Sequence, residues 1–334
     1  MNSMINALTK RALKFNKLAN FRKNKLDNED IYAVPAPYMA PLWLLSPPKS
    51  PSVPWAWGVP SLEFPVSQLC TSNQMEGEFY KQLCASAAVQ PEAHRKVWEF
   101  IYVKAVFDYY GLLNPGRRLL GFGIGQEPLP AAFAGRGASV LATDAPSETI
   151  ANMGWDTTNQ HASSLEQLYR WEIVSKEDFE RLVSFEPLDM NAIPAHLTDF
   201  DGCWSACALE HLGSIDHGLD FIESSLRTLK PGGVAVHTTE FNLSSNAETF
   251  DRDYLAIYRR QDFERLVARL VEQGHFVAPL NLHPGTTAVD EHIDLPPYAL
   301  PHLKLEVAGF VTTSFGLIVV KDGLSTDACA VVTE

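Results

Sequence analysis

Residues 118–127 read Arg118-Leu-Leu-Gly-Phe-Gly-Ile-Gly-Gln-Glu127, a short apolar strand that runs into three closely spaced glycines. Gly121, Gly123 and Gly125 permit a tight turn from a strand into a helix. They also let a ligand approach the backbone N–H groups at the start of that helix. Many nucleotide-binding folds use such a turn, so this stretch alone predicts a ligand-binding α/β fold but no particular ligand.

The next signal is Asp144, which closes a second predicted strand at 138–143, nineteen residues after Gly125. A carboxylate at this distance from a glycine turn can accept hydrogen bonds from both hydroxyls of a ribose. The alternative is a helix cap, the commoner role of a lone aspartate after a strand. The spacing favours ribose binding.

A third signal, Asp189-Met190, follows a predicted strand at 183–186. An acid there can accept the exocyclic amine of an adenine while its apolar neighbour packs on the ring. An ordinary turn aspartate is the alternative, and these residues alone do not decide between the two.

Strands and helices alternate along most of the chain, which predicts a mostly parallel sheet covered on both faces. The predicted strands lie at 117–123, 138–143, 183–186, 201–205, 233–238, 274–280 and 313–321, and the helices at 76–88, 92–112, 163–183, 215–229 and 261–273. Nothing divides this region, so we expect one domain over 76–334, with an insertion at about 146–182. A basic tail and a Pro/Trp-rich arm precede it over 1–75, and proline at that density in 33–65 argues against a helix or central strand.

Two further motifs complete the pattern: Phe200-Asp201 leading to Glu210-His211-Leu212, and Leu229-Lys-Pro-Gly-Gly233, where the last three residues are expected to end a helix. Taken with the glycine turn, Asp144 and Asp189-Met190, this order resembles the class I S-adenosylmethionine-dependent methyltransferases. The resemblance implies a three-layer, Rossmann-like, seven-stranded sheet whose last strand is antiparallel. It also implies S-adenosylmethionine as cofactor, with the three glycines along its methionine part, Asp144 on the ribose, Asp189 and Met190 on the adenine, and Ser205 beside the sulfur.

The chain departs from this family at Leu119, two residues before the first glycine, where many relatives carry an acid. Glu127, just past the turn, is the candidate that serves the cofactor's amino group instead.

Methyl transfer requires proximity and orientation and, for a hydroxyl acceptor, a base. Candidates follow the fourth and fifth predicted strands, because ligands bind beyond the carboxyl ends of parallel strands. His211 and His237 are each candidate general bases, with ordinary loop or backbone hydrogen bonding as the alternative for both. Glu240 is the candidate that orients the acceptor.

Cys207, Glu210 and His211 occupy the places of a metal site found in a few methyltransferases of this type. Packing at a helix start is the favoured interpretation, so no metal is predicted.

A long segment over about 281–312 separates the last two predicted strands and includes Asp290, Asp294 and Tyr298. Segments of this length in compact domains are commonly functional, and we expect a substrate loop here. The arm around Trp43–Trp57 and the helix start at His94–Trp98 are candidates for the opposite wall, with core packing the favoured role for the tryptophans.

Charge narrows the range of partners. The net charge is −13, but the first 25 residues hold seven basic residues and no acid, so the remainder carries −20. A negative charge of this size repels the phosphate backbone, which disfavours a nucleic-acid substrate. The basic start predicts a solvated tail, with an amphipathic membrane-surface helix or a mitochondrial-type presequence as alternatives.

Five cysteines without a Cys-x-x-Cys pair suit a reducing compartment, and we expect a cytoplasmic protein.

These observations predict methyl transfer from S-adenosylmethionine to a small polar acceptor with a hydroxyl or amine, such as a sugar, a glycan or a natural-product precursor. Two alternatives stay open: a catalytically inactive cofactor-binding partner subunit, and an NAD-dependent dehydrogenase that uses the same turn. The oligomeric state is not predicted.

Overall fold

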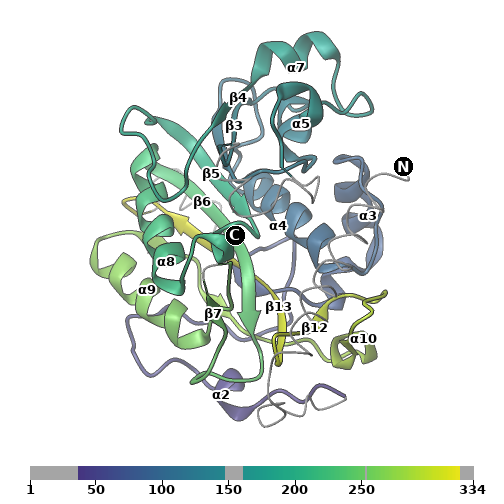
Figure 1. Ribbon diagram of the computed structural model, residues 1–334, viewed down its shortest axis with the longest axis vertical. Coiled ribbons are helices and arrows are strands. Elements are labelled where there is room, and N and C mark those ends of the chain that lie inside the picture. The colour runs from purple at the N-terminus through teal and green to yellow at the C-terminus, as the bar shows by residue number, and fades with distance from the viewer. Residues whose placement is uncertain (1–36, 147–160, 253, 324–334) are drawn as a thin grey trace.

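The computed structural model describes residues 37–146, 161–252 and 254–323, which form a central sheet flanked by helices (Figure 1). Five parallel strands lie side by side in the order β4-β3-β2-β5-β6, and β13 pairs with β6 in the antiparallel sense. β9 pairs with β13 and therefore runs parallel to the first five. These seven strands span Val183–Pro187, Ser139–Asp144, Arg118–Phe122, Phe200–Ala206, Leu229–Asn242, Phe310–Val320 and Phe276–Val277. The predicted sheet, with its last strand antiparallel, is confirmed.

Four short strands extend the sheet to 11, so the expected number of seven was too small. They are β1 (Ser67–Leu69), β10 (Leu280–Asn281), β11 (Ile293–Asp294) and β12 (Lys304–Val307). Strands of two to four residues show no readable alternation, so the sequence pattern does not reveal them. β1 pairs with β13, which places residues 67–69 in the sheet although they precede the predicted domain boundary.

Helices cover both faces, giving three layers. On one face lie α3 (Gly77–Ala85), α4 (Arg95–Tyr109) and α5 (Leu129–Ala134), and on the other α8 (Ile215–Ser225) and α9 (Arg260–Glu272) (Figure 1). Strand residues alternate between the layers: Trp204 and Val236 belong to the core around α4, whereas Cys203 and Ala235 belong to the core around α8.

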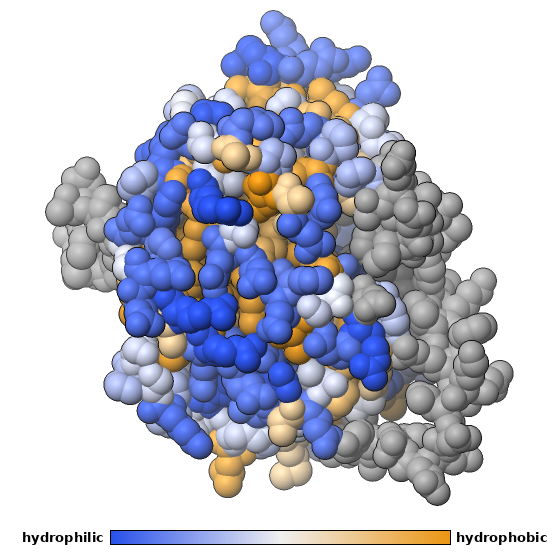
Figure 2. All heavy atoms as spheres, turned by 60° about the vertical axis from the view of Figure 1, so that its left-hand side comes forward, coloured by the Kyte–Doolittle hydropathy of each residue, from blue (hydrophilic) through white to orange (hydrophobic). Residues whose placement is uncertain are grey.

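The outer helices bury one apolar side each. In α8, Ser214 caps the first turn by accepting a hydrogen bond from the His217 N–H, and Ile215, Leu219 and Ile222 face the sheet. Hydrophilic side chains cover most of the outer surface on this side of the molecule (Figure 2). Both helices are therefore ordinary amphipathic covers for the sheet.

Three expected elements differ from the structure. The helix predicted over 163–183 is replaced by the 3-10 turn η3 (Leu165–Leu168) and α7 (Lys176–Leu182), because Ser175 caps a new helix start. The rest of the predicted insertion falls on 147–160, outside the described residues. The helix predicted over 215–229 ends at Ser225, since Leu229 already pairs with Phe200 in the sheet. The Pro-rich arm contains one helical turn, α2 (Leu42–Leu45), where no helix was expected.

The smaller elements complete the fold. α10 (Ala288–Glu291) lies between β10 and β11, and β7 (Asp251–Arg252) pairs with β8 (Leu255–Ala256). None of the described helices combines the length and apolarity needed to cross a bilayer. The basic residues 1–25 lie outside the described part of the chain, so the expectations for them stay predictions.

Gly218 offers a test of how α8 seats the loop that follows β5. A Cβ at this position would lie 1.7 Å from the Tyr258 hydroxyl and 3.0 Å from the Leu209 carbonyl oxygen. Alanine is the better helix former by about 1 kcal/mol, but overpacking costs about 1–3 kcal/mol. We expect Gly218→Ala to lower the free energy of unfolding in a urea titration. The exposed Asp220→Ala should change it by less than about 0.5 kcal/mol; equal stability of both variants would contradict the packing described here.

Candidate functional site

The glycine turn lies at the carboxyl end of β2 and joins it to α5. Gly123 and Gly125 have φ values of +58° and +53°, in the left-handed region that glycine adopts without strain. A Cβ on Gly123 would lie 2.7 Å from the Ala208 Cβ and 3.1 Å from the Met190 sulfur. The turn is therefore brought against the ends of two other strands, as a ligand site between them requires.

Gly121 serves packing. A Cβ there would lie 2.5 Å from atoms of Ile124 and Trp204, so this glycine makes room for a buried tryptophan. Its role along the methionine part of a cofactor, like that of Gly123 and Gly125, stays a prediction.

Asp144 ends β3 and is 3% exposed. Its carboxylate accepts hydrogen bonds from the N–H groups of Ala145 (2.8 Å) and Ala162 (2.9 Å), and the His161 Nδ1 lies 3.4 Å away. Each carboxylate oxygen has two acceptor positions, so these bonds leave capacity for another donor. Asp144 thus anchors residues 161–162 within the predicted insertion, and its ribose role stays a prediction.

The predicted adenine-binding pair divides into two environments. Met190 is buried against Gly123, whereas Asp189 is exposed and accepts a hydrogen bond from the Asn191 N–H at 2.9 Å. The Met190 side chain therefore packs beside the glycine turn. Asp189 makes the local hydrogen bond of an ordinary turn aspartate, the alternative to adenine binding, and the adenine role of both residues stays a prediction.

Glu127 is 4% exposed at the start of α5, and its Oε1 accepts a hydrogen bond from the Trp204 indole N–H at 2.5 Å. Burial raises the pKa of this carboxyl to about 8, although the Trp204 bond and the charge of Lys96 oppose the shift. A buried acid without a directly paired cation can accept a cationic group from a ligand.

Ser205 and His237 pair with each other instead of facing the charged residues. The Ser205 Oγ lies 2.9 Å from the His237 Nδ1, and the Ser225 Oγ lies 3.1 Å from its Nε2. His237 is 1% exposed and packs on Phe221 of α8, and burial lowers its pKa to about 3. His237 and Glu240, three residues apart in one strand, point to opposite faces of the sheet. The structure therefore does not bring His237 to the acceptor side or leave Ser205 open to a sulfur.

A buried charge cluster lies on the α4 side, at the carboxyl ends of β5 and β6. We define it as Arg95, Lys96, Glu99, Cys207, Glu210 and Glu240. At its centre is Glu99, fully buried, which accepts hydrogen bonds from Lys96 Nζ (2.8 Å), Arg95 Nη1 (3.3 Å) and Cys207 Sγ (2.9 Å). Burial by itself would raise the pKa of Glu99, but Lys96 and Arg95 outweigh it and lower the pKa to about 2.

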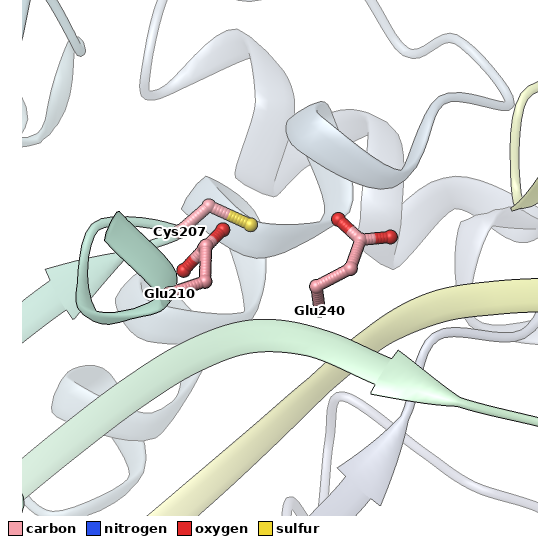
Figure 3. Close-up of side chains that lie close together, drawn as sticks. All are labelled: Cys207, Glu210 and Glu240. Carbon is pink, nitrogen blue, oxygen red and sulfur yellow. The ribbon is translucent and has the colours of Figure 1, made fainter. Parts of the chain in front are cut away.

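The other two acids of the cluster complete it. Glu240 forms an ion pair with Arg95 at 2.7 Å, and Glu210 accepts a hydrogen bond from the Thr239 hydroxyl at 3.2 Å. Burial raises the pKa of Glu210, partly offset by Lys96. Figure 3 shows Cys207 and Glu210 reaching from the turn after β5 toward Glu240, which rises from β6. Cys207 has a φ of +50°, a strained value for a residue with a side chain.

One ligand atom from each of Cys207, Glu210 and Glu240 lies within 4.8 Å of the others, a separation that a metal ion could bridge. Arg95 already neutralises Glu240, and the Cys207 thiol donates to Glu99. The described partners thus satisfy this group without a metal ion, and the expectation of no metal stays a prediction. The His211 ring lies elsewhere: its Nδ1 lies 2.8 Å from the Tyr254 carbonyl oxygen. A base role for His211 also stays a prediction.

Sequence reasoning missed the cations of this site and Glu99. A signal was present: Glu99 stands four residues after Arg95 and three after Lys96, at the start of a largely apolar helix. An acid embedded in an apolar helix indicates a buried partner, because an isolated buried charge is costly.

Glu127 also yields a pH-dependent test. An acid whose pKa is higher in the folded state opposes folding increasingly as pH rises from its unfolded pKa toward its folded pKa of about 8. We expect Glu127→Gln to gain free energy of unfolding relative to the parent chain between about pH 5 and about pH 8, on the order of 1–4 kcal/mol. Urea titrations at both pH values measure this. The exposed Glu78→Gln is the control, and an equal difference between Glu127→Gln and the parent at both pH values would refute the buried acid.

Comparisons with known proteins add little. No protein-family model matches the chain, and no curated protein does. Among solved structures, the chain is similar to magnesium protoporphyrin IX methyltransferase from Synechocystis PCC 6803, with 12% identity, 74% of this chain and 89% of that chain covered, and a TM-score of 0.39. It is also similar to CalS10, an amino pentose methyltransferase from Micromonospora echinaspora, with 12% identity, 74% of this chain and 98% of that chain covered, and a TM-score of 0.37. Its similarity to the cyclase SpnF has 19% identity and a TM-score of 0.34, and covers 53% of this chain. The match covers 60% of SpnF, so the chain spans less than two thirds of that protein.

All three TM-scores are below 0.5. The fold assignment depends instead on the molecule itself: five parallel strands in the order β4-β3-β2-β5-β6, the antiparallel β13 beside them, and a glycine turn at the carboxyl end of the central β2. This chain has the fold of the class I S-adenosylmethionine-dependent methyltransferases.

Proposed function

We propose that this protein transfers a methyl group from S-adenosylmethionine to a small polar acceptor that bears a hydroxyl or an amine. The observation that carries the proposal is the convergence at one edge of the sheet. The left-handed Gly123 turn lies against Met190 and against Ala208, the residue next to Cys207. The buried Glu127 carboxylate lies close enough to Lys96 and Glu99 of the buried charge cluster to feel their charges. Ligands of open α/β sheets bind at this edge.

Glu127 supports the cofactor assignment. Its carboxylate is buried, and its one described side-chain partner is the neutral indole N–H of Trp204. The α-ammonium group of S-adenosylmethionine would supply a charged donor here, and a charge-assisted hydrogen bond is about twice as strong as a neutral one. Glu127 would thereby take the role of the acid that many relatives carry at the position of Leu119. Gly123 and Met190 would bound the cofactor, which supplies an activated methyl group when bound.

The buried charge cluster supports a polar acceptor. Arg95 is 9% exposed, and its Nε is buried with no hydrogen-bond partner among the described residues. An unpaired buried donor costs about 1–3 kcal/mol, which a polar ligand atom or a water would recover. Glu240 and Arg95 would orient the acceptor, and sugars, glycan units and natural-product precursors present suitable hydroxyl and amine groups.

In this proposal the protein contributes binding and orientation. Glu240 is fixed by its ion pair with Arg95 and by a hydrogen bond from the Thr312 hydroxyl, so it would hold an acceptor group in one position. Holding the two reactants in position in this way lowers the activation barrier of a bimolecular displacement by several kcal/mol.

Ligand-dependent unfolding tests the cofactor. A ligand that binds only the folded state at about 100 times its Kd raises stability by about 2.7 kcal/mol. We expect S-adenosylhomocysteine to raise the Tm of the full chain and NAD(H) to leave it unchanged. Stabilisation by NAD(H) alone would instead favour a dehydrogenase, and binding without turnover of any acceptor would favour a partner subunit.

Glu127→Gln separates the proposed ammonium contact from the fold. Glutamine keeps the acceptor for Trp204 but removes the negative charge, so we expect the Kd for S-adenosylhomocysteine to rise about 10-fold, since a charge-assisted bond contributes about 1–2 kcal/mol more than a neutral one. Isothermal titration calorimetry measures this, with Glu78→Gln as the matched control. An unchanged Kd would remove Glu127 from the cofactor site.

A further inference from the structure

An aspartate–histidine pair, unused by the function proposed so far, lies beside the start of α4. The His302 Nδ1 forms a short hydrogen bond with the Asp294 carboxylate, and the two residues are 8% and 4% exposed. The Asp294 carboxylate, at the end of β11, also accepts a hydrogen bond from the Ala299 N–H, with 3.1 Å to each oxygen, which ties it to the loop between β11 and β12. This loop belongs to the segment predicted to contact substrate.

The pair is attached to the buried charge cluster through the backbone. The Arg95 N–H donates to the His302 carbonyl at 2.9 Å, and the His302 N–H donates to the Ala93 carbonyl at 2.9 Å. His302 is therefore held beside the residue whose guanidinium pairs with Glu240 at 2.7 Å. The pair and the cluster thus share one edge of the sheet.

Two aromatic neighbours fix the His302 ring. The His94 ring lies 4.6 Å from it, and the His94 Nδ1 is held in place by the Lys96 N–H. The Tyr298 ring lies 5.4 Å away in an edge arrangement, and its hydroxyl donates to the Glu306 carbonyl at 2.6 Å. Little rotation is open to His302, which suits a group that must meet a bound ligand in one orientation.

We propose that His302 is the general base for the acceptor and that Asp294 is its positioning residue, an inference that rests on the methyl transfer proposed above. With the Nδ1 proton held by Asp294, the basic lone pair is on Nε2. That atom has no hydrogen-bond partner among the described residues, and 11% of the side chain is exposed. His237, by contrast, engages both ring nitrogens with serine hydroxyls.

The base narrows the acceptor to a hydroxyl. A neutral amine attacks a methyl group with its own lone pair, whereas an alcohol is a weak nucleophile until its proton is removed. In the transfer, the acceptor oxygen forms a bond to the methyl carbon as the carbon–sulfur bond breaks and its electron pair stays on sulfur. The hydroxyl proton moves to the His302 Nε2, giving a methyl ether, S-adenosylhomocysteine and an imidazolium that then loses its proton to water.

The first experiment tests the exposed, oriented Nε2 without any cofactor. The full chain is treated with diethyl pyrocarbonate near neutral pH, and the rate of acylation at each histidine is followed by peptide mass spectrometry. We expect His302 to be acylated, the buried His237 to be spared, and Asp294→Asn to slow His302 at least about 10-fold while the exposed His217 is unaffected. Protection of His302 from the reagent, or an unchanged rate in Asp294→Asn, overturns the proposal.

The second experiment tests catalysis with a panel of hydroxyl- and amine-bearing sugars and phenols and isotopically labelled S-adenosylmethionine. We expect the parent chain to methylate hydroxyls, and His302→Gln to lower kcat at least about 100-fold while its Kd for S-adenosylhomocysteine stays within about twofold. Asp294→Asn should lower kcat about 10-fold, and His217→Gln is the control. The unchanged Kd shows that a slow variant is folded.

The outcomes separate the two proposals. No binding of S-adenosylhomocysteine by the parent chain removes the methyl transfer and the base together. Full activity of His302→Gln, transfer to amines alone, or binding with no transfer to any hydroxyl removes the base and leaves the cofactor site.

Discussion

The carboxylate of Glu99 on α4 is fully buried, and two strands, one turn and its own helix supply the hydrogen-bond donors that keep it charged. Lys96 and Arg95 donate from α4, while Cys207, Thr238 and Ser314 donate from the turn after β5, from β6 and from β13. A buried charge is tolerated when such bonds surround it, and it is costly when any of them is lost. Apolar packing holds the body of α4 on the sheet, and the bonds to Glu99 tie its first turn to β6, β13 and the turn after β5, beside the Arg95–Glu240 ion pair.

The sheet then separates two kinds of polar group. On the α8 face, His237 is closed between Ser205 and Ser225, a neutral network that fixes the core. On the α4 face, charged side chains gather around Glu99 and lead outward to Asp294 and His302. Alternation along β6 decides which side chain joins which group, since residues an odd number apart point to opposite faces. The charged groups that we propose for the acceptor therefore lie on the α4 face.

The cofactor side and the acceptor side differ in how they are built. The glycine turn, Asp144 and Met190 come from consecutive strand ends, and Gly123 with Met190 meet because parallel strands end at the same edge. The acceptor side is assembled from α4, the turn after β5, β6 and the loop between β11 and β12. These segments are far apart in sequence: Arg95 and His302 are separated by 207 positions. Local sequence motifs therefore identify the cofactor side, whereas the acceptor side forms only when distant segments pack together.

The sequence by itself determined the alternation of strands and helices, the mostly parallel sheet and the glycine turn, because each follows from local periodicity, glycine geometry and spacing. The antiparallel last strand was implied only by the resemblance of the motifs to the class I methyltransferases. It also indicated Glu127 and Glu240 as residues to examine. Only the tertiary structure decided that His237 faces away from Glu240, that Asp144 already holds Ala145 and Ala162, and that Asp294 meets His302 beside Arg95. These pairings depend on strand faces, buried partners and contacts between distant segments, and a linear pattern carries none of that information.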